Sequence, residues 1–322
     1  MTPDGAALGA RLRERDLTAA PAALNLLEST APADREQSAA LMSEVSPGRL
    51  GGEAPGHLVG LTGPPGAGKS TLLSALLHHW RGGPGESGAS TVAVLAVDPS
   101  SRRSGGSLLG DRARIEFDAA DRGVLIRSTA AGERLGGLAR ATRAAAHALA
   151  AAFDLVVIET VGVGQAETEI ADVADTVAVV VQPGSGDVLQ FLKAGIMEIP
   201  DVLVVTKADL GQVAMRTRRD LSAALRSLGS RSTPVLAVSS LPPASGVQEL
   251  ASALEEHRAR ADIPARRLRS RRAAALSEFV AEHGERGLRE LGGRGAAEGT
   301  LAEQPPGLEV PALVAVLEQA VR

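Results

Sequence analysis

The chain has 322 residues, a formal net charge of −4 and no cysteine. This length allows one sizeable α/β core with helical additions, and the small charge gives no general attraction to nucleic acid or anionic lipid. Disulfides, thiolate metal sites and cysteine nucleophiles are excluded. Aromatic residues make up only 2% of the chain, so we do not expect nucleic acid to bind by base stacking.

The N-terminal segment has no apolar stretch that could form the core of a secretion signal. Nor does any apolar run approach the roughly 18 residues that a membrane span needs. We therefore expect a cytoplasmic protein with neither a membrane nor a nucleic acid as its partner.

The first 50 residues are expected to form a helical extension that ends in a linker. Leucines at roughly helical spacing predict two short helices within residues 7–30. Residues 46–56 are rich in glycine and proline, which is typical of a turn-rich linker.

From His57 onward, buried strands alternate with longer helical segments. Most of the expected strands are continuous apolar runs, which indicates that helices cover both faces of the sheet. The pattern predicts an α/β fold with a doubly wound, mainly parallel sheet and a ligand at the carboxyl ends of its strands. The expected strands are His57–Thr62, Thr91–Val97, Val124–Arg127, Leu155–Glu159, Thr176–Gln182, Val202–Thr206 and Val235–Ser239.

The chain beyond the last strand is expected to be helical. Residues 247–290 have a helical pattern that includes an arginine-rich stretch over 266–272, which we interpret as a solvated face rather than a nucleic-acid site. A glycine-rich stretch over 292–299 and a proline pair follow, and a last short helix is expected over 310–321.

A glycine-rich loop directly follows the first expected strand and opens a helix, as the P-loop pattern G-x-x-x-x-G-K-[ST] requires. Its backbone amides and the helix N-terminus attract phosphate groups. Lys69 is expected to reach the β- and γ-phosphates, and the Ser70 hydroxyl to ligate Mg²⁺. The predicted nucleotide contacts are Gly63, Pro64, Pro65, Gly66, Ala67, Gly68, Lys69, Ser70 and Thr71.

A second motif, Thr206-Lys207-Ala208-Asp209, ends the strand over 202–206 and favours guanine over adenine. A carboxylate at Asp209 can accept hydrogen bonds from N1–H and the 2-amino group of guanine, and adenine has no such pair of donors. The stem of Lys207 would lie along the base, and Thr206 stands where asparagine is usual. Ser239 and Ser240 follow the next strand, where a backbone amide would meet guanine O6. We therefore predict GTP and GDP as ligands.

Hydrolysis of GTP requires a metal site with acidic ligands. Glu159 ends an apolar strand, where its carboxylate can hold Mg²⁺, and the Gly162 amide can sense the γ-phosphate. Asp98 and Asp111 are also placed to complete the metal site, although either could instead cap a helix. The predicted metal ligands are Ser70, Asp98, Asp111 and Glu159, and the predicted catalytic residues are Lys69, Glu159 and Gly162.

Together these segments resemble the MeaB/ArgK family of P-loop GTPases, relatives of the human protein behind methylmalonic aciduria type A. The resemblance covers roughly residues 10–260. Thr206, the continuation MEIPD over 197–201 and the chain beyond about Arg260 depart from the family pattern. The segments that carry it are LTGPPGAGKSTL (61–72), VLAVDPSS followed by SGGSLLGDR (94–112), DLVVIETVGVGQAE (154–167), QPGSGDVLQFLKAGIMEI (182–199) and VVTKADL (204–210).

The resemblance implies a GTPase chaperone of an adenosylcobalamin-dependent acyl-CoA mutase of the methylmalonyl-CoA mutase type, which gates cofactor loading and protects the mutase. It also implies a homodimer built by the C-terminal arm. The expected division is an N-terminal helical extension and linker (1–50), a P-loop GTPase domain (51–262) and a C-terminal helical arm (263–322).

Two other functions remain open at this point. One is a transport-associated ATPase or kinase, which would need adenine specificity and a membrane-protein partner. The other is a GTPase metallochaperone, a class that usually carries histidine-rich or cysteine-based metal motifs. This chain has six histidines, of which only His78 and His79 are adjacent, and no cysteine.

Overall fold

The computed structural model describes residues 3–82, 90–98, 115–130, 140–160, 169–184, 200–230 and 232–321, without the side chains of Asp98 and Ala130. These residues form two compact units. One unit comprises Met1–Gly56, Arg143–Ala152 and Asp262–Arg322, and the other comprises His57–Thr142 and Phe153–Ala261.

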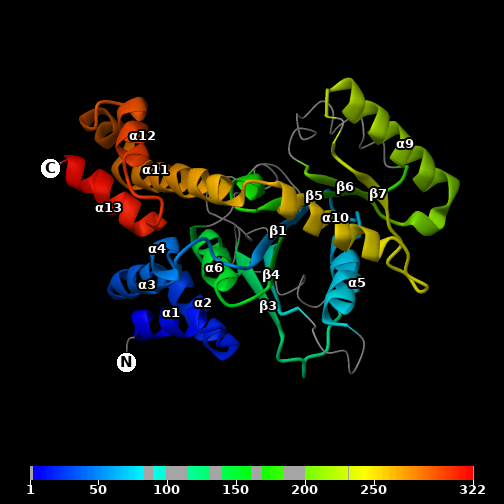
Figure 1. Cartoon of the computed structure of the whole chain (residues 1–322), viewed down its shortest axis with the longest axis horizontal. Coiled ribbons are helices and arrows are strands. Elements are labelled where there is room, and N and C mark those ends of the chain that lie inside the picture. The colour runs from blue at the N-terminus through cyan, green and yellow to red at the C-terminus, as the bar shows by residue number, and fades with distance from the viewer. Residues whose placement is uncertain are drawn as a thin grey trace, which may run out of the picture. The chain divides into compact units, whose positions relative to one another are not determined.

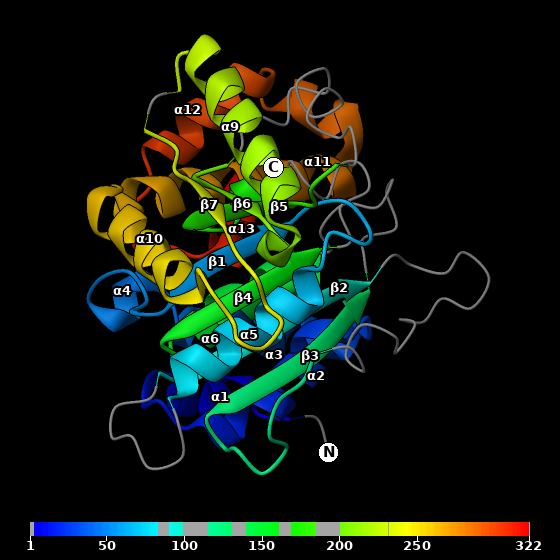
Figure 2. The same cartoon turned by 90° about the vertical axis from the view of Figure 1, so that its right-hand side faces the viewer.

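The second unit is built on a seven-stranded sheet with the order β3-β2-β4-β1-β5-β6-β7 (Figures 1 and 2). All of its neighbouring strands run parallel, so their carboxyl ends share one edge. The predicted α/β fold with a parallel sheet is confirmed. The strands are β1 (His57–Thr62), β2 (Val92–Asp98), β3 (Val124–Ala130), β4 (Leu155–Thr160), β5 (Thr176–Val181), β6 (Val202–Val205) and β7 (Val235–Ala237).

Helices α5 (Lys69–Arg81) and α10 (Val247–Arg260) lie side by side in this unit (Figures 1 and 2). Their apolar side chains form one core with alternate residues of the strands, such as Val59 of β1 and Val180 of β5. Successive strand residues point to opposite faces of a sheet, and both faces of β1 are buried. Burial on both faces explains the continuous apolar runs of the sequence.

Two short turns and one further helix of this unit lie near β1, β6 and β7. Ile170 of the 3₁₀ turn η3 (Ile170–Asp172) sits where a side chain at Gly60 would otherwise lie. After β6, the turn η5 (Ala208–Leu210) leads into α9 (Gln212–Ser227), which contacts β6 and β7.

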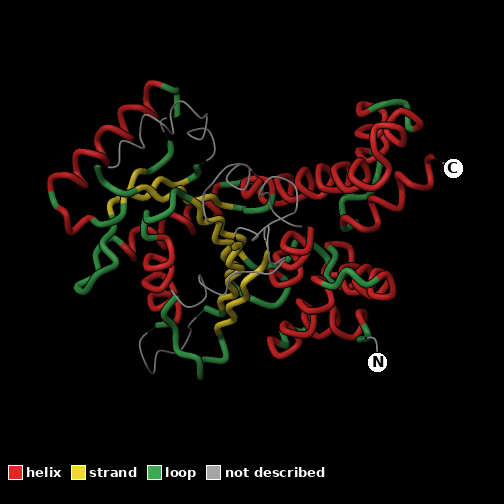
Figure 3. The backbone as a smooth tube through the Cα atoms, turned by 180° about the vertical axis from the view of Figure 1, so that it is seen from behind, coloured by secondary structure: helices red, strands yellow, loops and turns green. Residues whose placement is uncertain are grey.

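The first unit consists of helices, drawn in red in Figure 3. Its C-terminal helices share an apolar core that includes Phe279, Leu301 and Leu317. The unit comprises α1 (Gly5–Arg13), η1 (Leu17–Ala19), α2 (Ala20–Glu28), α3 (Pro32–Glu44), α4 (Pro47–Leu50), most of α6 (Arg140–Ala150), α11 (Ile263–Glu290, kinked at Gly284), α12 (Arg294–Ala302) and α13 (Val310–Val321).

The arginine-rich stretch of α11 is not the solvated face that the sequence suggested. Arg267 and Arg271, one helical turn apart, are only 4% and 1% exposed. Arg271 donates to both carboxylate oxygens of Glu53 at 2.8 and 2.7 Å, and Arg267 donates to the carbonyl oxygens of Ala54 and Gly56. These two guanidinium groups therefore hold the linker within the helical unit.

No helix in the described part of the chain combines the length and apolar character that crossing a membrane requires.

Candidate functional site

The loop of residues 63–68 connects β1 to α5 at the carboxyl edge of the sheet. Gly63 has φ 145°, and a Cβ atom there would lie 2.0 Å from the carbonyl oxygen of Val180 in β5. Gly68 has φ 86° and precedes the first residue of α5. Both positions therefore require glycine, because a side chain would clash or strain the backbone.

The N-terminus of α5 suits a phosphate group. Its N-cap residue, Gly68, makes no side-chain cap hydrogen bond, and its own first turn has no acidic residue. Lys69 is 7% exposed, and its ammonium donates to the carbonyl oxygens of Gly63 at 2.6 Å and Pro64 at 3.1 Å. The ammonium thus lies inside the loop, where the phosphates of a nucleotide would be expected.

The next residue of α5 faces the end of β4. The Ser70 hydroxyl donates to Oε1 of Glu159 at 2.9 Å, and Glu159 is 5% exposed. The contact brings together a hydroxyl and a carboxylate, which are oxygen ligands of the kind that Mg²⁺ prefers. These two side chains therefore fit the magnesium ion expected from the sequence.

The other predicted members of the metal site are not described. Asp111 lies outside the described residues, as does the side chain of Asp98, whose backbone ends β2. Gly162, which was predicted as a catalytic residue, also lies outside them. Among the described side chains, no group of three or more histidines and carboxylates could hold a metal ion. The Ser70–Glu159 contact is the described part of that site.

The guanine motif begins where β6 ends. Thr206 is 3% exposed, and its hydroxyl shares its hydrogen between the carbonyl oxygens of Ala67 at 2.6 Å and Val181 at 3.1 Å. Threonine at this position therefore ties the motif to the P-loop, despite being shorter than the usual asparagine.

The rest of the motif turns toward the loop after β7. Lys207 has φ 53°, a left-handed backbone that is uncommon for a side chain of this length. Asp209 accepts a hydrogen bond at 3.1 Å from the hydroxyl of Ser239, which is 4% exposed. Ser240 is the next residue along. The structure thus brings the predicted base-binding residues of two strand ends together.

One residue of this region was not singled out in the sequence. Gln182 directly follows β5, and its Oε1 accepts a hydrogen bond from the Lys207 ammonium at 2.7 Å. The signal that the sequence offers is its position at the end of the expected strand Thr176–Gln182.

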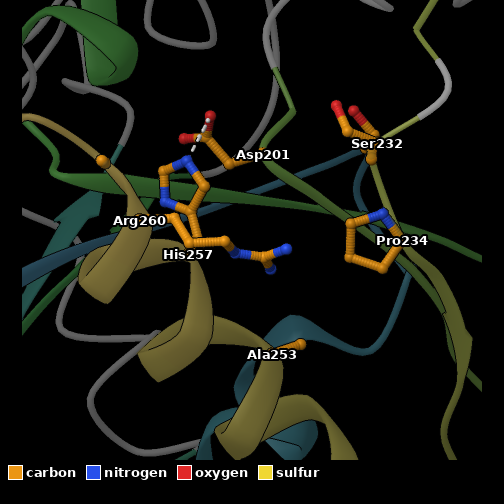
Figure 4. A pocket seen from close by; sticks show the side chains of 8 residues that line it. Asp201, Ser232, Pro234, Ala253, His257 and Arg260 are labelled. Carbon is orange, nitrogen blue, oxygen red and sulfur yellow. Dashed lines mark ion pairs between the residues drawn. The ribbon is translucent and has the colours of Figure 1, made fainter.

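A separate pocket of about 240 Å³ lies where β6 and β7 begin, at the opposite edge of the sheet (Figure 4). His257 of α10 lies 3.1 Å from Asp201 through one ring nitrogen and 2.8 Å from Thr176 Oγ1 through the other. Both ring nitrogens are therefore engaged. The pocket contains none of the predicted site residues, and its lining is Asp201, Ser232, Thr233, Pro234, Ala253, His257, Arg260 and Ala261.

A parallel sheet with helices packed on it, and a glycine-rich loop between β1 and α5 that encloses a lysine, define the class of P-loop nucleotide triphosphatases. Comparison with known proteins then identifies the family. Residues 20–289 match the family described as Methylmalonyl Co-A mutase-associated GTPase MeaB.

Two relatives illustrate the match. A protein of Mycobacterium tuberculosis named as a GTPase is 43% identical over 267 residues, covering 80% of this chain and 75% of the relative. The mouse mitochondrial methylmalonic aciduria type A homolog is 39% identical over 219 residues, covering 65% and 52%. Among solved structures, the LAO/AO transport system kinase superposes with a TM-score of 0.64 at 26% identity, covering 98% of this chain and 96% of that one.

The chain belongs to the MeaB family and is a GTPase, which confirms the family and the activity expected from the sequence. Membership also implies guanine-nucleotide binding. The structural likeness to the transport system kinase supports the fold and gives no support to a transport function.

Proposed function

We propose that this GTPase binds GTP and Mg²⁺ at the carboxyl edge of the sheet and acts as a chaperone of an adenosylcobalamin-dependent acyl-CoA mutase. The family description, which names its members as mutase-associated, carries the partner assignment. In this account nucleotide turnover gates cofactor loading and protects the mutase.

Each part of the site has a role in this proposal. The backbone amides of Gly63 and of residues 66–71 bind the phosphates, whereas Pro64 and Pro65 have no N–H to donate and only line the loop. The Lys69 ammonium moves from the carbonyl oxygens of the loop to the β- and γ-phosphates. Asp209 accepts from the guanine donors while the Ser239 hydroxyl orients its carboxylate, and the backbone after β7 meets O6.

Ser70 and Glu159 hold Mg²⁺ together with Asp98 and Asp111, and the ion neutralises charge on the β- and γ-phosphates when it is bound. The contact between Ser70 and Glu159 supports the first two of these assignments. Gly162 is proposed to donate its amide to the γ-phosphate. Apart from Asp111, the proposed nucleotide and metal contacts therefore come from the P-loop and from the ends of β2, β4, β6 and β7.

The organisation of the whole chain is also part of the proposal. Residues 51–262 act as the GTPase domain, the helices before them form an extension, and the arm of residues 263–322 builds a homodimer. We place the protein in the cytoplasm. The transport-associated alternative is disfavoured because Asp209 has no pair of donors to meet on adenine.

Turnover of GTP with and without the mutase tests the partner assignment. Alone, the protein is expected to hydrolyse GTP slowly, because its sequence offers no clear arginine or water-positioning residue of the kind that fast GTPases use. Adding a cobalamin-dependent acyl-CoA mutase from the same genome should raise the rate at least several-fold. If no such mutase changes the rate, the protein is a GTPase with a different partner.

A further inference from the structure

Two consecutive residues at the end of β6 each bridge the same pair of segments. The Thr206 hydroxyl contacts Ala67 of the P-loop and Val181, the last residue of β5. The Lys207 ammonium contacts Gly66, one residue earlier in the P-loop, and Gln182, one residue after β5. We call the Thr206 contacts the inner bridge and the Lys207 contacts the outer bridge. The inner bridge is buried and both of its acceptors are backbone carbonyls. The outer bridge is exposed, and one of its acceptors is the side chain of Gln182.

The outer bridge fixes the ammonium end of the Lys207 side chain. The ammonium donates to Gln182 Oε1 at 2.7 Å and to the carbonyl oxygen of Gly66 at 3.2 Å, so the amide contact is the shorter one. A hydrogen bond from a charged donor is shorter and stronger than one between neutral groups. Without it, Lys207 is held at that end by the longer Gly66 contact.

The near end of the same side chain is fixed by the backbone. Lys207 has φ 53° and ψ 43°, and the next amide, of Ala208, donates to the carbonyl oxygen of Val238 at 3.1 Å. The direction in which the lysine stem leaves the backbone is therefore set. Its four carbons extend from this point to the ammonium between Gly66 and Gln182, across the place where we propose that the base lies.

We propose that Gln182 is a positioning residue for guanine-nucleotide binding, acting through Lys207. Its amide oxygen holds the ammonium at the P-loop, so that the lysine stem lies along the base before the nucleotide arrives. The proposal rests on the proposed nucleotide site, because it assumes that the Thr206–Asp209 motif binds the base. Preorganisation of this kind raises affinity by removing the cost of ordering the side chain on binding.

Three substitutions at Gln182 test the role. Gln182→Leu removes the acceptor, and Gln182→Asn keeps the amide but withdraws it by one methylene. Both should weaken GDP binding about three- to tenfold in calorimetric titrations. They should raise the KM for GTP similarly and leave kcat unchanged, since in this proposal the bridge orders the base site and not the Ser70–Glu159 contact. Gln182→Glu keeps an acceptor within reach and should bind GDP at least as tightly as the parent.

A matched control and a double variant separate positioning from general damage. Gln212 at the start of α9 is exposed, and Gln212→Leu should bind GDP like the parent. In a Lys207→Met background the ammonium is gone, so adding Gln182→Leu should cause no further loss. Additive losses would overturn the proposal, because Gln182 would then act independently of Lys207.

The comparison of GDP with ADP separates this inference from the proposed function. If the parent prefers GDP over ADP but Gln182→Leu and Gln182→Asn bind GDP like the parent, this inference is wrong and the proposed function stands. If the parent binds GDP and ADP equally, the base site itself is misassigned and the proposed function fails first. A loss of kcat or of thermal stability without a rise in KM would assign Gln182 a structural role and overturn positioning.

Discussion

At the residue scale, the hydrogen bond from Ser70 to Glu159 joins the P-loop helix to the carboxylate that we assign to Mg²⁺. Ser70 comes from the first turn of α5 and Glu159 from β4, and the neighbouring Thr160 hydroxyl donates to Thr62 of β1 at 2.8 Å. The carboxylate is therefore placed by two adjacent strands whose register pairs Leu61 with Glu159. Its position does not depend on a flexible loop.

Replacing this carboxylate tests its role. Glu159→Gln preserves size and the capacity to accept from Ser70, but it removes the negative charge that we assign to Mg²⁺ binding. GTP hydrolysis at fixed Mg²⁺ should fall by roughly two orders of magnitude or more, a loss typical of removing a key electrostatic group. The fold should survive, as judged by circular dichroism and the melting temperature.

Glu116→Gln is a suitable control, because this exposed glutamate interacts with the Ser74 hydroxyl through its backbone amide only. Parental hydrolysis by Glu159→Gln would make Glu159 a structural residue and refute its place in the metal site.

At the element scale, most of the strands could be predicted and most of the differences concern helices. Continuous apolar runs marked the strands because both faces of the sheet are buried. β3 extends to Ala130, three residues beyond the expected end, since Ser128 and Thr129 pair with β2 although they are polar. Backbone pairing decides a strand end, and a hydropathy pattern does not report it.

The glycine-rich stretch after α11 likewise forms a regular element that its local sequence does not predict. Residues Arg294–Ala302 form α12 although the sequence there is rich in glycine, because Ala297 and Leu301 are buried against α11 and α13. Tertiary packing outweighs the low helix propensity of glycine. Similarly, the expected helical run over 247–290 is divided into α10 and α11 around residues 261–262.

The site was predictable to the extent that it depends on strand ends. The P-loop, Glu159 and the guanine motif all lie at the ends of expected strands. The tie from Thr206 to Ala67 and the bridge from Lys207 to Gln182 could not be predicted, because both require knowing that β6 lies next to β5 and how closely the P-loop approaches them.

Arg81 and Asp121 form an ion pair at the end of α5. Arg81, the last residue of α5, donates from two nitrogens to both carboxylate oxygens of Asp121, each at 2.7 Å. These hydrogen bonds hold the pKa of the Asp121 carboxyl below its usual value of 3.8, although burial acts in the opposite direction. The carboxylate therefore ties the helix end to the turn before β3.

Because the pKa is lower in the folded state, the stabilisation is present above about pH 4 and is lost as the pH falls further. Asp121→Asn should remove it, so the parent should lose up to about 1 kcal/mol more stability than the variant between pH 7 and pH 3. Urea unfolding at the two pH values measures this difference. Asp220→Asn, in an exposed pair 3.9 Å from Arg216, should behave like the parent. Equal pH dependence in Asp121→Asn and the parent would contradict the assignment.

At the scale of the whole molecule, both units bury charged groups as well as apolar surface. In the sheet unit the buried charges include Lys69 and Glu159, and in the helical unit they include Arg267 and Arg271. Arg271 is 1% exposed and lies beside Glu53 and, at 4.0 Å, Glu309, so its guanidinium is compensated by two carboxylates. Such buried charges are tolerated only when they are paired.

The proposed nucleotide site likewise depends on several strands of the sheet. Its described residues come from the ends of β1, β4, β5, β6 and β7, which lie far apart in the sequence and meet only because the strands are parallel and adjacent. The claim that this assembly selects guanine depends on one carboxylate, that of Asp209. Nucleotide choice therefore tests the complete account in one assay.

The most direct measurement is a calorimetric titration of the parent and of Asp209→Asn with GDP, ADP and xanthosine diphosphate. Xanthine carries a carbonyl where guanine carries its 2-amino group, so an asparagine amide can donate to it where a carboxylate cannot. The parent should bind GDP well over tenfold more tightly than ADP, since losing a charged hydrogen-bonding pair costs about 2–3 kcal/mol. Asp209→Asn should lose GDP affinity and prefer xanthosine diphosphate. Equal binding of GDP and ADP by the parent, or unchanged GDP binding by the variant, would contradict the account.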